Sequence, residues 1–551
     1  MAGADAVCDV IVVGSGAGGL AAAVFCAAAG LDVRVLEKDH TVGGTTAISG
    51  GMVWIPDNPH MRAMGAQDSI AAAELYLDAL GAAATPLRRA FLEAGPRAIA
   101  FLEQRTQARF RPVKSYPDYY PDRPGATLGG RVLEPLPFDG RALGPWFARV
   151  KPPLPAFTLF GGMMVDRADI PHFRKAGKSL RSFARVAELT ARYAGQRLSH
   201  ARGTTLYLGN ALVARLLASA LDAGVRIETG AAVSALVEED GRVAGVTSSE
   251  GRTLRARRGV VLAAGGFPHC GRLAPALLPG KASTYSAADA GDTGDGLRLG
   301  ASVGGVMGRQ AHGNAFWVPV SLPPGGRPHP HTVTDRGKPG AIAVDRSGHR
   351  FANEARSYHQ FVEDMLAAGA VPCHLVCDAD FLKSYGLGTI KPFALSTQAE
   401  EKSGYLVKGG SLAELAVKLG IDPAGLERTV AAFNAGADEG RDPAFGRGRD
   451  AYQRHMGDAA RQPNPCVAPL RRPPFYGVTL YPGTLGTAAG LAVDGAARVL
   501  DTQGAPIPGL HAAGNDVNSV MDGTYPGPGI TLGPALTFAF LAAEALSASN
   551  V

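Results

Sequence analysis

The sequence predicts an α/β fold in which a domain built on a parallel sheet carries a second, inserted α+β domain. Residues 10–36 have the pattern of strand, glycine turn, helix and strand, the unit from which parallel sheets are assembled. A later apolar strand at 259–264 has the composition of another central strand of that sheet. After it, over about 280–460, hairpin and paired-helix patterns replace this alternation. We therefore assign 1–280 and 460–551 to the first domain and 281–459 to the inserted cap domain.

The N-terminal unit begins with a short, continuous apolar run at 10–13, as expected of a strand buried on both faces. Residues 17–29 are rich in small helix formers, and Gly30 is placed to end that helix. Residues 33–36 form the next strand, which a right-handed crossover would place parallel to the first.

Three glycines follow the first strand in a GxGxxG pattern. Gly14 permits a tight turn, Gly16 lets the backbone approach a diphosphate, and Gly19 lets the helix pack closely on the strand. The amides at the helix N-terminus then face the phosphates. Glu37 ends the second strand at about the 20-residue spacing of an acid that binds a ribose hydroxyl. This pattern predicts a dinucleotide site without a 2′-phosphate and leaves NAD and FAD both open.

The remaining strands and helices follow in order along the chain. A helix over 212–224 precedes a meander of strands over 231–266, whose last strand is expected to return to the parallel sheet. The glycine-rich turns at 289–305 are expected to open the cap domain. Later elements are a hairpin over 340–354 that turns at Ser347-Gly348, a buried strand over 373–377, two helices within 411–440, a strand within 504–518 and a long helix within 529–546.

Composition and charge restrict the classes of function. The 551 residues, 46% of them hydrophobic, exceed one ordinary core. The net charge is +6, and no basic stripe with interleaved aromatic residues occurs, so we expect no nucleic acid partner. The six cysteines form no CxxC pair, and neither a secretory signal nor an apolar membrane span is found, which predicts a cytoplasmic protein. The mildly basic surface leaves peripheral association with an anionic membrane open. His329 and His331 lack further ligands at metal spacing, so we expect no metal.

Two segments resemble known flavoproteins. EKDHTVGGTTAISGG at 37–51 and GLHAAGN at 509–515 are similar to the pattern of the fumarate reductase and ketosteroid dehydrogenase superfamily. The resemblance extends over almost the whole chain and implies a Rossmann-like FAD-binding domain. In covalent members a histidine near Thr45 carries the flavin, and because none lies between His40 and His60 here, non-covalent FAD is implied. The residues implied in cofactor binding are Gly14, Ser15, Gly16, Ala17, Gly18, Gly19, Glu37, Lys38, Gly43, Gly44, Thr45, Thr46, Ser49, Gly50, Val233, Ala264, Gly265, Gly514, Asn515, Thr531 and Leu532.

The dicarboxylate branch of this superfamily uses arginines to clamp its substrate, since a guanidinium matches a carboxylate bidentately. The corresponding C-terminal stretch, GTYPGPGITLG at 523–533, contains no arginine, and Ser357-Tyr358 stands where those reductases tend to carry Arg-Asp. Arg336 roughly aligns with their proton-donating arginine, but we expect it to have a surface or structural role.

Tyrosines occupy the positions where the dicarboxylate enzymes carry charged residues. YPDYY at 116–120, ARSYHQF at 355–361 and TYPGPG at 524–529 resemble motifs of the 3-ketosteroid Δ1-dehydrogenases. The resemblance implies that Tyr358 is the general base, that Tyr119 supports it, and that Tyr525 and Gly529 bind the C3 carbonyl. It further implies a 3-ketosteroid substrate, a C1–C2 double bond in the product, and an electron acceptor such as a quinone.

The chemistry suits these residue types. A base must remove the C2 proton, and two donors must stabilise the developing enolate in a site of the oxyanion-hole type. Because the pKa of a phenol is about 10 in water, Tyr358 needs either a lowered pKa or a partner for its proton, for which Tyr119 is the candidate. A flat, apolar substrate predicts a wide cleft between the domains. Two segments are expected either to line this cleft or to pack behind it, residues 316–320 and the segment GGMVWIP.

Three alternatives remain open. A ketosteroid dehydrogenase acting at C4–C5 would use the same flavin with different tyrosine geometry. A fumarate reductase-like enoate reductase is disfavoured by the missing arginines. A non-catalytic flavoprotein would not need the tyrosines.

Overall fold

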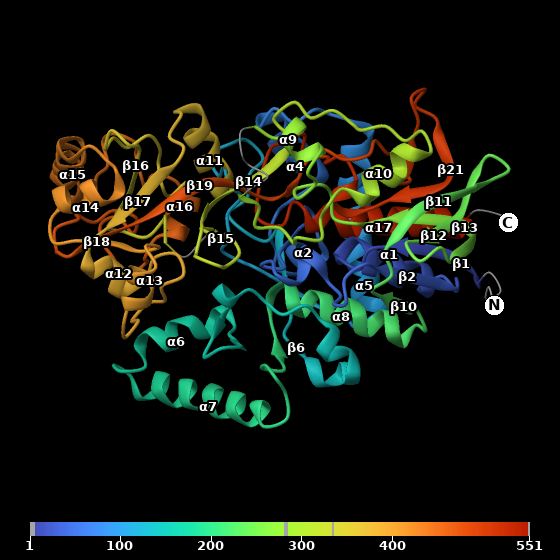
Figure 1. Ribbon diagram of the computed structural model, residues 1–551, viewed down its shortest axis with the longest axis horizontal. Helices are drawn as coiled ribbons and strands as arrows, with labels where there is room; N and C mark the ends of the chain where they lie inside the picture. The colour runs from blue at the N-terminus through green and yellow to red at the C-terminus, as the bar shows by residue number, and fades with distance from the viewer. Residues whose placement is uncertain (1–5, 280–284, 333–334, 549–551) are drawn as a thin grey trace.

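The computed structural model describes residues 6–279, 285–332 and 335–548. Figure 1 shows one sheet at the end of the molecule that carries both chain termini and a second sheet at the opposite end. A helical segment with α6 (Ile170–Lys175) and α7 (Leu180–Arg197) lies along one side. The predicted α/β class with an added α+β part is confirmed.

The first sheet has five parallel strands, with β1 and β13 at its centre. In spatial order they are β10 (Arg226–Thr229), β2 (Val33–Glu37), β1 (Ala6–Val13), β13 (Thr253–Leu262) and β21 (Pro506–Ala512). The predicted strand–helix–strand unit is confirmed, because β1 and β2 pair in parallel and α1 (Ala17–Ala28) connects them.

The predicted meander branches from this sheet. β11 (Val233–Glu239) and β12 (Arg242–Ser248) pair antiparallel, and β12 pairs with the first residues of β13. The later residues of β13, 260–262, pair in parallel with β21. The strand predicted at 259–264 therefore begins earlier, at Thr253. Its first residues belong to the antiparallel meander and its last residues to the parallel sheet.

Helices cover the first sheet and complete its core. α1 contacts both α8 (Leu208–Asp222) and α17 (Leu532–Ala548), and α17 also contacts α5 (Pro86–Arg105). Other elements of this half are α2 (Gly44–Ala47), α3 (Pro59–Ala63), α4 (Ile70–Ala79), α9 (Leu273–Leu277), α10 (Asp295–Ser302), β3 (Val53–Trp54), β4 (Phe110–Pro112), β5 (Val132–Pro135), β6 (Phe138–Asp139), β7 (Thr158–Leu159), β8 (Met163–Met164), β9 (Thr205–Leu206) and β20 (Arg498–Leu500).

The second sheet is antiparallel and has β19 near its centre. Its strands are β15 (His329–Pro330), β14 (Ala315–Ser321), β19 (Phe475–Thr487), β17 (Cys373–Cys377), β16 (Ala341–Val344) and β18 (Val407–Gly409). Its helices are α11 (Tyr358–Ala367), α12 (Ala379–Tyr385), α13 (Gln398–Lys402), α14 (Leu412–Leu419), α15 (Pro423–Ala437) and α16 (Ala451–Met456). The predicted strand at 373–377, the two helices within 411–440 and the long C-terminal helix are confirmed.

The boundaries expected from the sequence do not follow the sheets at two places. β19 belongs to the second sheet, although 460–551 was assigned to the first domain. Conversely, α10, within the turns expected to open the cap, contacts β11 of the first sheet. Both errors have one cause, because local pattern shows that a strand or turn exists but not which sheet it joins.

The hairpin predicted over 340–354 forms only its first half. The turn is present, since the Gly348 N–H donates to the Asp345 carbonyl at 3.1 Å. After the turn, the backbone pairing with β16 consists of one bridge, between Val344 and Arg350. The carboxylate of Glu354 accepts the Ala343 N–H of β16 at 2.9 Å. A side chain thus takes the donor that a second strand would have used.

Candidate active site

One large cavity brings both predicted groups of residues together. Its volume is about 1630 Å³, whereas a site for one small molecule usually has about 300–1,000 Å³. All the predicted cofactor residues line it except Gly19 and Gly43, and so do the three predicted tyrosines and Gly529. The cavity therefore has room for a dinucleotide and a second molecule.

The glycine turn has the geometry that a phosphate cradle needs. Gly14 has φ +105°, and a Cβ on it would lie 2.2 Å from the Ala263 carbonyl oxygen. A Cβ on Gly19 would lie 2.0 Å from the Gly14 carbonyl oxygen, so Gly19 allows α1 to pack on the turn without lining the cavity. Gly16 at the N-cap of α1 has no capping side chain, and the Ala17 N–H donates to Thr46 Oγ1 at 3.0 Å. The N–H of Gly18, which also lines the cavity, has no acceptor among the described residues and remains for a ligand.

Glu37 at the end of β2 is held in place by the same turn. Its carboxylate accepts the Ser15 N–H at 2.9 Å and the Ser15 Oγ–H at 2.6 Å. The Asp39 N–H donates to its other oxygen at 2.9 Å. Ser15 Oγ in turn accepts the Gly43 N–H at 3.1 Å. Gly43 therefore supports the turn from behind, while the Glu37 carboxylate faces the cavity.

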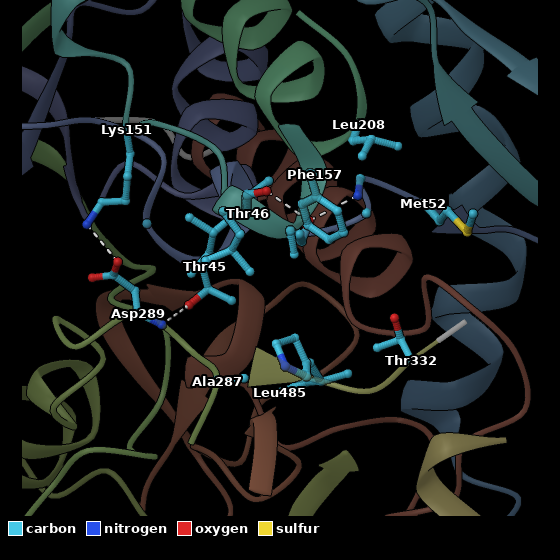
Figure 2. A pocket seen from close by; sticks show the side chains of 18 of the residues that line it. Thr45, Thr46, Met52, Lys151, Phe157, Leu208, Ala287, Asp289, Thr332 and Leu485 are labelled. Atoms are coloured by element: carbon cyan, nitrogen blue, oxygen red, sulfur yellow. Dashed lines mark hydrogen bonds and ion pairs between the residues drawn. The ribbon is translucent and has the colours of Figure 1, made fainter. Parts of the chain in front are cut away.

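A polar wall lies opposite, around Thr45 (Figure 2). Thr45 Oγ1 donates to the Asp292 carboxylate at 2.6 Å and accepts the Asp289 N–H at 2.7 Å. Lys151 Nζ bridges Asp39 at 2.7 Å and Asp289 at 2.6 Å. Burial raises the pKa of Asp292 well above its usual range.

The sequence analysis missed these groups. Asp289 and Asp292 lie in the turn-rich stretch that was expected to open the cap domain, but they line the cavity beside Thr45. Their repeated Asp-Gly pattern was a visible signal of a backbone shaped for close approach. Lys151 has no comparable signal, since the sequence around it contains no recognisable motif.

The three predicted catalytic tyrosines come from distant segments and meet in one buried cluster. Tyr358 Oη donates to Tyr525 Oη at 2.8 Å, and their ring centres lie 5.3 Å apart. The ring of Tyr119 lies 5.6 Å from each of the other two. Tyr119 Oη has no hydrogen-bond partner among the described residues. This unpaired hydroxyl directly beside Tyr358 is the feature expected of a proton partner.

The environment keeps these phenols neutral. Burial, followed by the nearby Tyr525, raises the pKa of Tyr358 well above its usual value. Burial likewise raises the pKa of Tyr119 and Tyr525. Tyr358 was expected to have either a lowered pKa or a partner that takes its proton. The residues around it raise its pKa, so the partner is the route that remains.

The C-terminal loop places Gly529 next to these rings. Gly529 has φ +98°, and a Cβ there would lie 2.6 Å from the Met52 carbonyl oxygen. Its carbonyl accepts the Trp54 N–H at 3.1 Å, whereas its own N–H has no acceptor within the described part of the chain. The Pro526 carbonyl accepts the Tyr119 N–H at 2.9 Å, which ties this loop to the first tyrosine motif.

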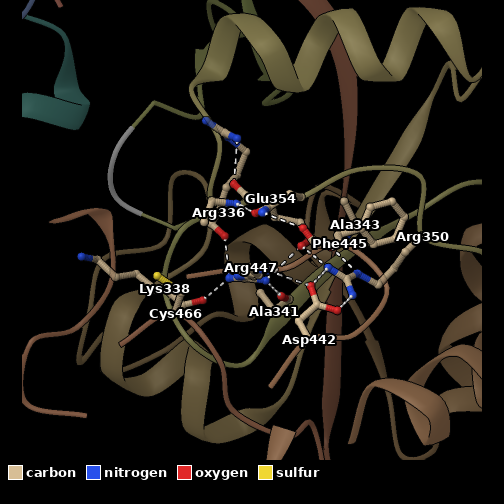
Figure 3. A network of polar contacts seen from close by, with 12 residues as sticks. Arg336, Lys338, Ala341, Ala343, Arg350, Glu354, Asp442, Phe445, Arg447 and Cys466 are labelled. Carbon is tan, nitrogen blue, oxygen red and sulfur yellow. Dashed lines mark hydrogen bonds and ion pairs between the residues drawn. The ribbon is translucent and has the colours of Figure 1, made fainter. Parts of the chain in front are cut away.

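Arg336 has the structural role expected of it and does not lie at the surface (Figure 3). It is buried, and its guanidinium donates to the backbone carbonyls of His331 at 2.9 Å and Glu354 at 3.0 Å. It does not line the cavity. Segment 316–320 also has a packing role, since Phe316 lies edge-on to Tyr525 with ring centres 5.4 Å apart.

The outer wall of the cavity was also missed by sequence reasoning. It is mainly apolar and comes from three segments, the loop and short strand at 154–161, residues 170–174 of α6 and the loop at 386–395. The run PPLPAFTLF at 152–160 was a visible signal, because a loop so rich in Leu, Phe and Pro needs an apolar surface or ligand to cover it.

Comparison with known proteins agrees with this geometry. Residues 9–532 match the FAD binding domain family. The chain belongs to this family. It is an FAD-dependent oxidoreductase, and the cavity fits FAD because its turn leaves a helix amide free for a diphosphate and its acid faces the cavity for a ribose.

Several relatives are named as dehydrogenases of cyclic ketones. This flavoprotein is 40% identical to a 4-oxocyclohex-2-ene-1-carboxylate 5-dehydrogenase of Sinomonas cyclohexanicum, covering 97% of this chain and 93% of the relative. It is 36% identical to a 3-oxosteroid 1-dehydrogenase of Mycobacterium tuberculosis, covering 97% of each. The 3-ketosteroid delta1-dehydrogenase of Sterolibacterium denitrificans, solved with 1,4-androstadiene-3,17-dione, matches with TM-score 0.91 and 36% identity over 99% of this chain and 100% of the other. The resemblance seen in the motifs is confirmed.

Proposed function

We propose that this flavoprotein is a 3-ketosteroid Δ1-dehydrogenase that binds FAD non-covalently and introduces a C1–C2 double bond into a 3-ketone. The observation that carries the proposal is the meeting of Tyr119, Tyr358, Tyr525 and Gly529 in the cavity that also holds the dinucleotide turn. These residues come from three separate segments, and each is the residue type that the Δ1-dehydrogenase motifs contain.

Each residue has a defined task in this proposal. Tyr525 accepts the hydrogen bond of Tyr358, so its own hydroxyl hydrogen remains for the substrate carbonyl. The free N–H of Gly529 is the second donor to that oxygen, where enolate charge develops. Tyr358 removes the C2 proton of the substrate. Tyr119 is the partner that takes up the hydroxyl proton of Tyr358. FAD, when bound, supplies the acceptor for the hydride from C1.

The decisive experiment is an anaerobic substrate screen read by flavin absorbance. A 3-ketosteroid such as androstenedione is expected to bleach the flavin, and succinate is expected to leave it unchanged. Product analysis should place the new double bond at C1–C2, since a C4–C5 product would favour the alternative dehydrogenase. Rapid reduction of fumarate by the reduced enzyme would contradict the proposal.

A second candidate substrate is a small cyclic keto acid. The 40% identical relative from Sinomonas is named for 4-oxocyclohex-2-ene-1-carboxylate. Removing one hydrogen from the carbon next to a ring ketone and one from the following carbon is the same chemistry and needs the same carbonyl donors and base. The screen therefore includes 4-oxocyclohexanecarboxylate beside the steroid.

The proposal includes a quinone as the electron acceptor. The apolar outer wall of the cavity suits a flat, apolar oxidant that enters after the product has left. Reoxidation of the bleached enzyme by menadione, faster than by oxygen, is the expected result. Reoxidation by oxygen alone would remove the quinone from the proposal.

We further propose a cytoplasmic location with peripheral membrane association. Phe160, Leu180 and Phe183 are exposed around α6 and α7, and the exposed Lys175 and Lys178 lie beside them. Apolar side chains among basic ones suit an anionic lipid surface. No helix in the described residues is long and apolar enough to cross a membrane. Cosedimentation with phosphatidylglycerol vesicles but not with phosphatidylcholine vesicles is expected, and equal recovery with both would contradict association through charge.

A further inference from the structure

An ammonium group without a carboxylate partner faces the cavity on the wall beside the tyrosines. Lys338 lines the cavity, and its Nζ donates to the backbone carbonyls of Met456 and Gly457 at 2.7 Å each. Among the described residues, no carboxylate oxygen lies within 4.0 Å of this nitrogen. Because an ammonium has three N–H donors, one remains. Figure 3 shows the side chain of Lys338 pointing away from the network around Arg336.

A second cation lies on the same wall. Arg167 also lines the cavity, with Cζ 5.6 Å from the centre of the Tyr116 ring. The ring of His455 lies 4.6 Å from that of Tyr116. Burial, followed by the charges of Arg167 and Lys338, lowers the pKa of His455 to about 4. Both cations therefore lie near a neutral His455, and we call Lys338 and Arg167 the cationic wall.

Neither cation is neutralised by a close partner of its own. The carboxylate nearest to Arg167 is that of Glu134 at 3.7 Å, and Glu134 is already bound by Arg111 at 2.7 Å. Burial, followed by the charge of Arg174, lowers the pKa of Lys338 to about 8, and the more distant Asp458 offsets only part of this effect. An anion entering the cavity would stabilise both charges.

The cationic wall lies close to the position proposed for the reacting ring. Met456, whose carbonyl holds Lys338, has its Sδ 4.0 Å from Tyr116 Oη. Tyr116 belongs to the same short motif as Tyr119, whose ring lies 5.6 Å from that of Tyr525. The ring of Tyr452 lies 6.4 Å from that of Tyr116 and 4.7 Å from that of Tyr119. Met456, Tyr116, Tyr452 and Tyr119 thus connect the wall that holds Lys338 to the ketone-binding tyrosine.

We propose that the cationic wall binds a carboxylate carried on, or next to, the ring that is dehydrogenated. The proposal rests on the ketone dehydrogenation proposed above and takes up its second candidate substrate, a cyclic ketone that is also a carboxylic acid. A carboxylate offers acceptors both to the free N–H of Lys338 and to the guanidinium of Arg167, and such charge-assisted hydrogen bonds are the strong ones.

Two kinds of molecule carry this chemistry. In 4-oxocyclohexanecarboxylate the carboxylate sits across one ring from the ketone, so its binding group must lie on the cavity wall near the tyrosines, as Lys338 and Arg167 do. In a 3-ketosteroid with a side-chain carboxylate the charge lies at the far end. It would reach the outer wall, where Lys391 Nζ donates to the Pro155 and Ala156 carbonyls at 3.2 and 2.7 Å. The geometry assigns the first kind.

The test compares charge removal at the two lysines in the holoenzyme. Lys338→Met is expected to lower kcat/KM for 4-oxocyclohexanecarboxylate by about 10-fold or more, mainly through KM, since a charge-assisted contact made equally in ground and transition states is lost. Its kcat/KM for uncharged 4-methylcyclohexanone should stay within about 2-fold. Lys338→Arg keeps the charge and should recover part of the loss. Lys391→Met is the comparison variant, with a smaller effect expected on the ring acid.

Binding is also measured without turnover, by titrating cyclohexanecarboxylate and reading the flavin spectrum. Weaker binding of cyclohexanecarboxylate to Lys338→Met, with flavin content and thermal stability unchanged, supports the proposal. If no ketone is dehydrogenated, only the proposed function is refuted, and the binding result still stands. Equal kcat/KM for the acid and the neutral ketone in the wild type overturns the proposal and leaves the function standing. A loss seen with Lys391→Met in place of Lys338→Met also overturns it, because the carboxylate then lies at the outer wall.

Discussion

The phenols of Tyr119, Tyr358 and Tyr525 lie together in one buried cluster, and the burial of each side chain constrains the mechanism. Tyr358 has a pKa raised by burial, yet it is the proposed base. A proton can therefore leave it only along the cluster, where Tyr119 Oη lacks a partner among the described residues and Tyr525 is already bonded to it. Proton removal is thus a property of the cluster more than of one side chain.

Replacing Tyr358 by phenylalanine removes the hydroxyl and keeps the ring. We expect turnover to fall by at least about 10², the low end for the loss of a general base, with FAD still bound. Steady-state turnover and the flavin absorbance of the purified variant provide the measurement. Turnover close to that of the wild type would remove Tyr358 from the mechanism.

Tyr525→Phe addresses the other half of the reaction. The phenol should bind the ketone oxygen more strongly as enolate charge develops, so its removal should lower turnover more than it weakens binding. A fall of about 10²–10³ in the rate of flavin reduction is expected from the loss of one such donor. Anaerobic stopped-flow measures that rate and substrate affinity together. A variant that loses affinity but keeps its reduction rate would speak against this role.

The lowered pKa of Lys338 gives a pH dependence. Its ammonium is present below a pKa of about 8 and is lost above it. Arg174 and Asp458 are the charged groups acting on it, with opposite signs, and Cys466 stays protonated because burial raises its pKa to about 11. KM for the ring keto acid should therefore rise above pH 8, while KM for a neutral ketone should not. The same rise in Lys338→Met would contradict the assignment.

At the scale of elements, the turn between β1 and α1 carries the cofactor site by its backbone. Gly14→Ala places a side chain at φ +105° and 2.2 Å from the Ala263 carbonyl oxygen. We expect loss of bound FAD and a lower thermal midpoint, beyond the roughly 1–2 kcal/mol of the backbone conformation alone. Flavin content after purification and a thermal melt measure both effects.

Gly30→Ala is the matched control, at the other end of the same helix. Gly30 has φ +85°, but a Cβ there would meet nothing within 4 Å. This variant should show only the backbone penalty and retain its FAD. Equal losses in both variants would mean that the close approach at Gly14 does not matter.

For the whole molecule, the mode of FAD attachment is the property to test. The wall around Thr45 is made of hydroxyls, carboxylates and an ammonium, and Thr45 itself is engaged with Asp292. No histidine lies between His40 and His60, so we expect FAD to be bound without a covalent link. Acid precipitation is expected to release all the FAD into the supernatant, whereas yellow colour in the pellet would show a covalent bond.

The sequence by itself determined the elements whose signal is local. The apolar run of β1, the glycines at 14, 16 and 19, and Glu37 at the end of β2 form a local pattern, so the turn and its acid were predictable. Gly14, Gly16 and Glu37 line the cavity, whereas Gly19 packs the helix on the turn. The tyrosine motifs were identified in the same way, as short patterns read by resemblance.

Only the tertiary structure decided what depends on contacts between distant segments. It placed β19 in the second sheet, brought Asp292 to Thr45, and brought both Lys338 and Tyr116 to Met456. It also raised the pKa of Tyr358, which no local pattern indicates, because burial depends on everything that surrounds the phenol. Backbone conformation and periodicity depend mainly on residues a few positions apart, whereas sheet partners and the electrostatics of a cavity depend on residues hundreds of positions apart.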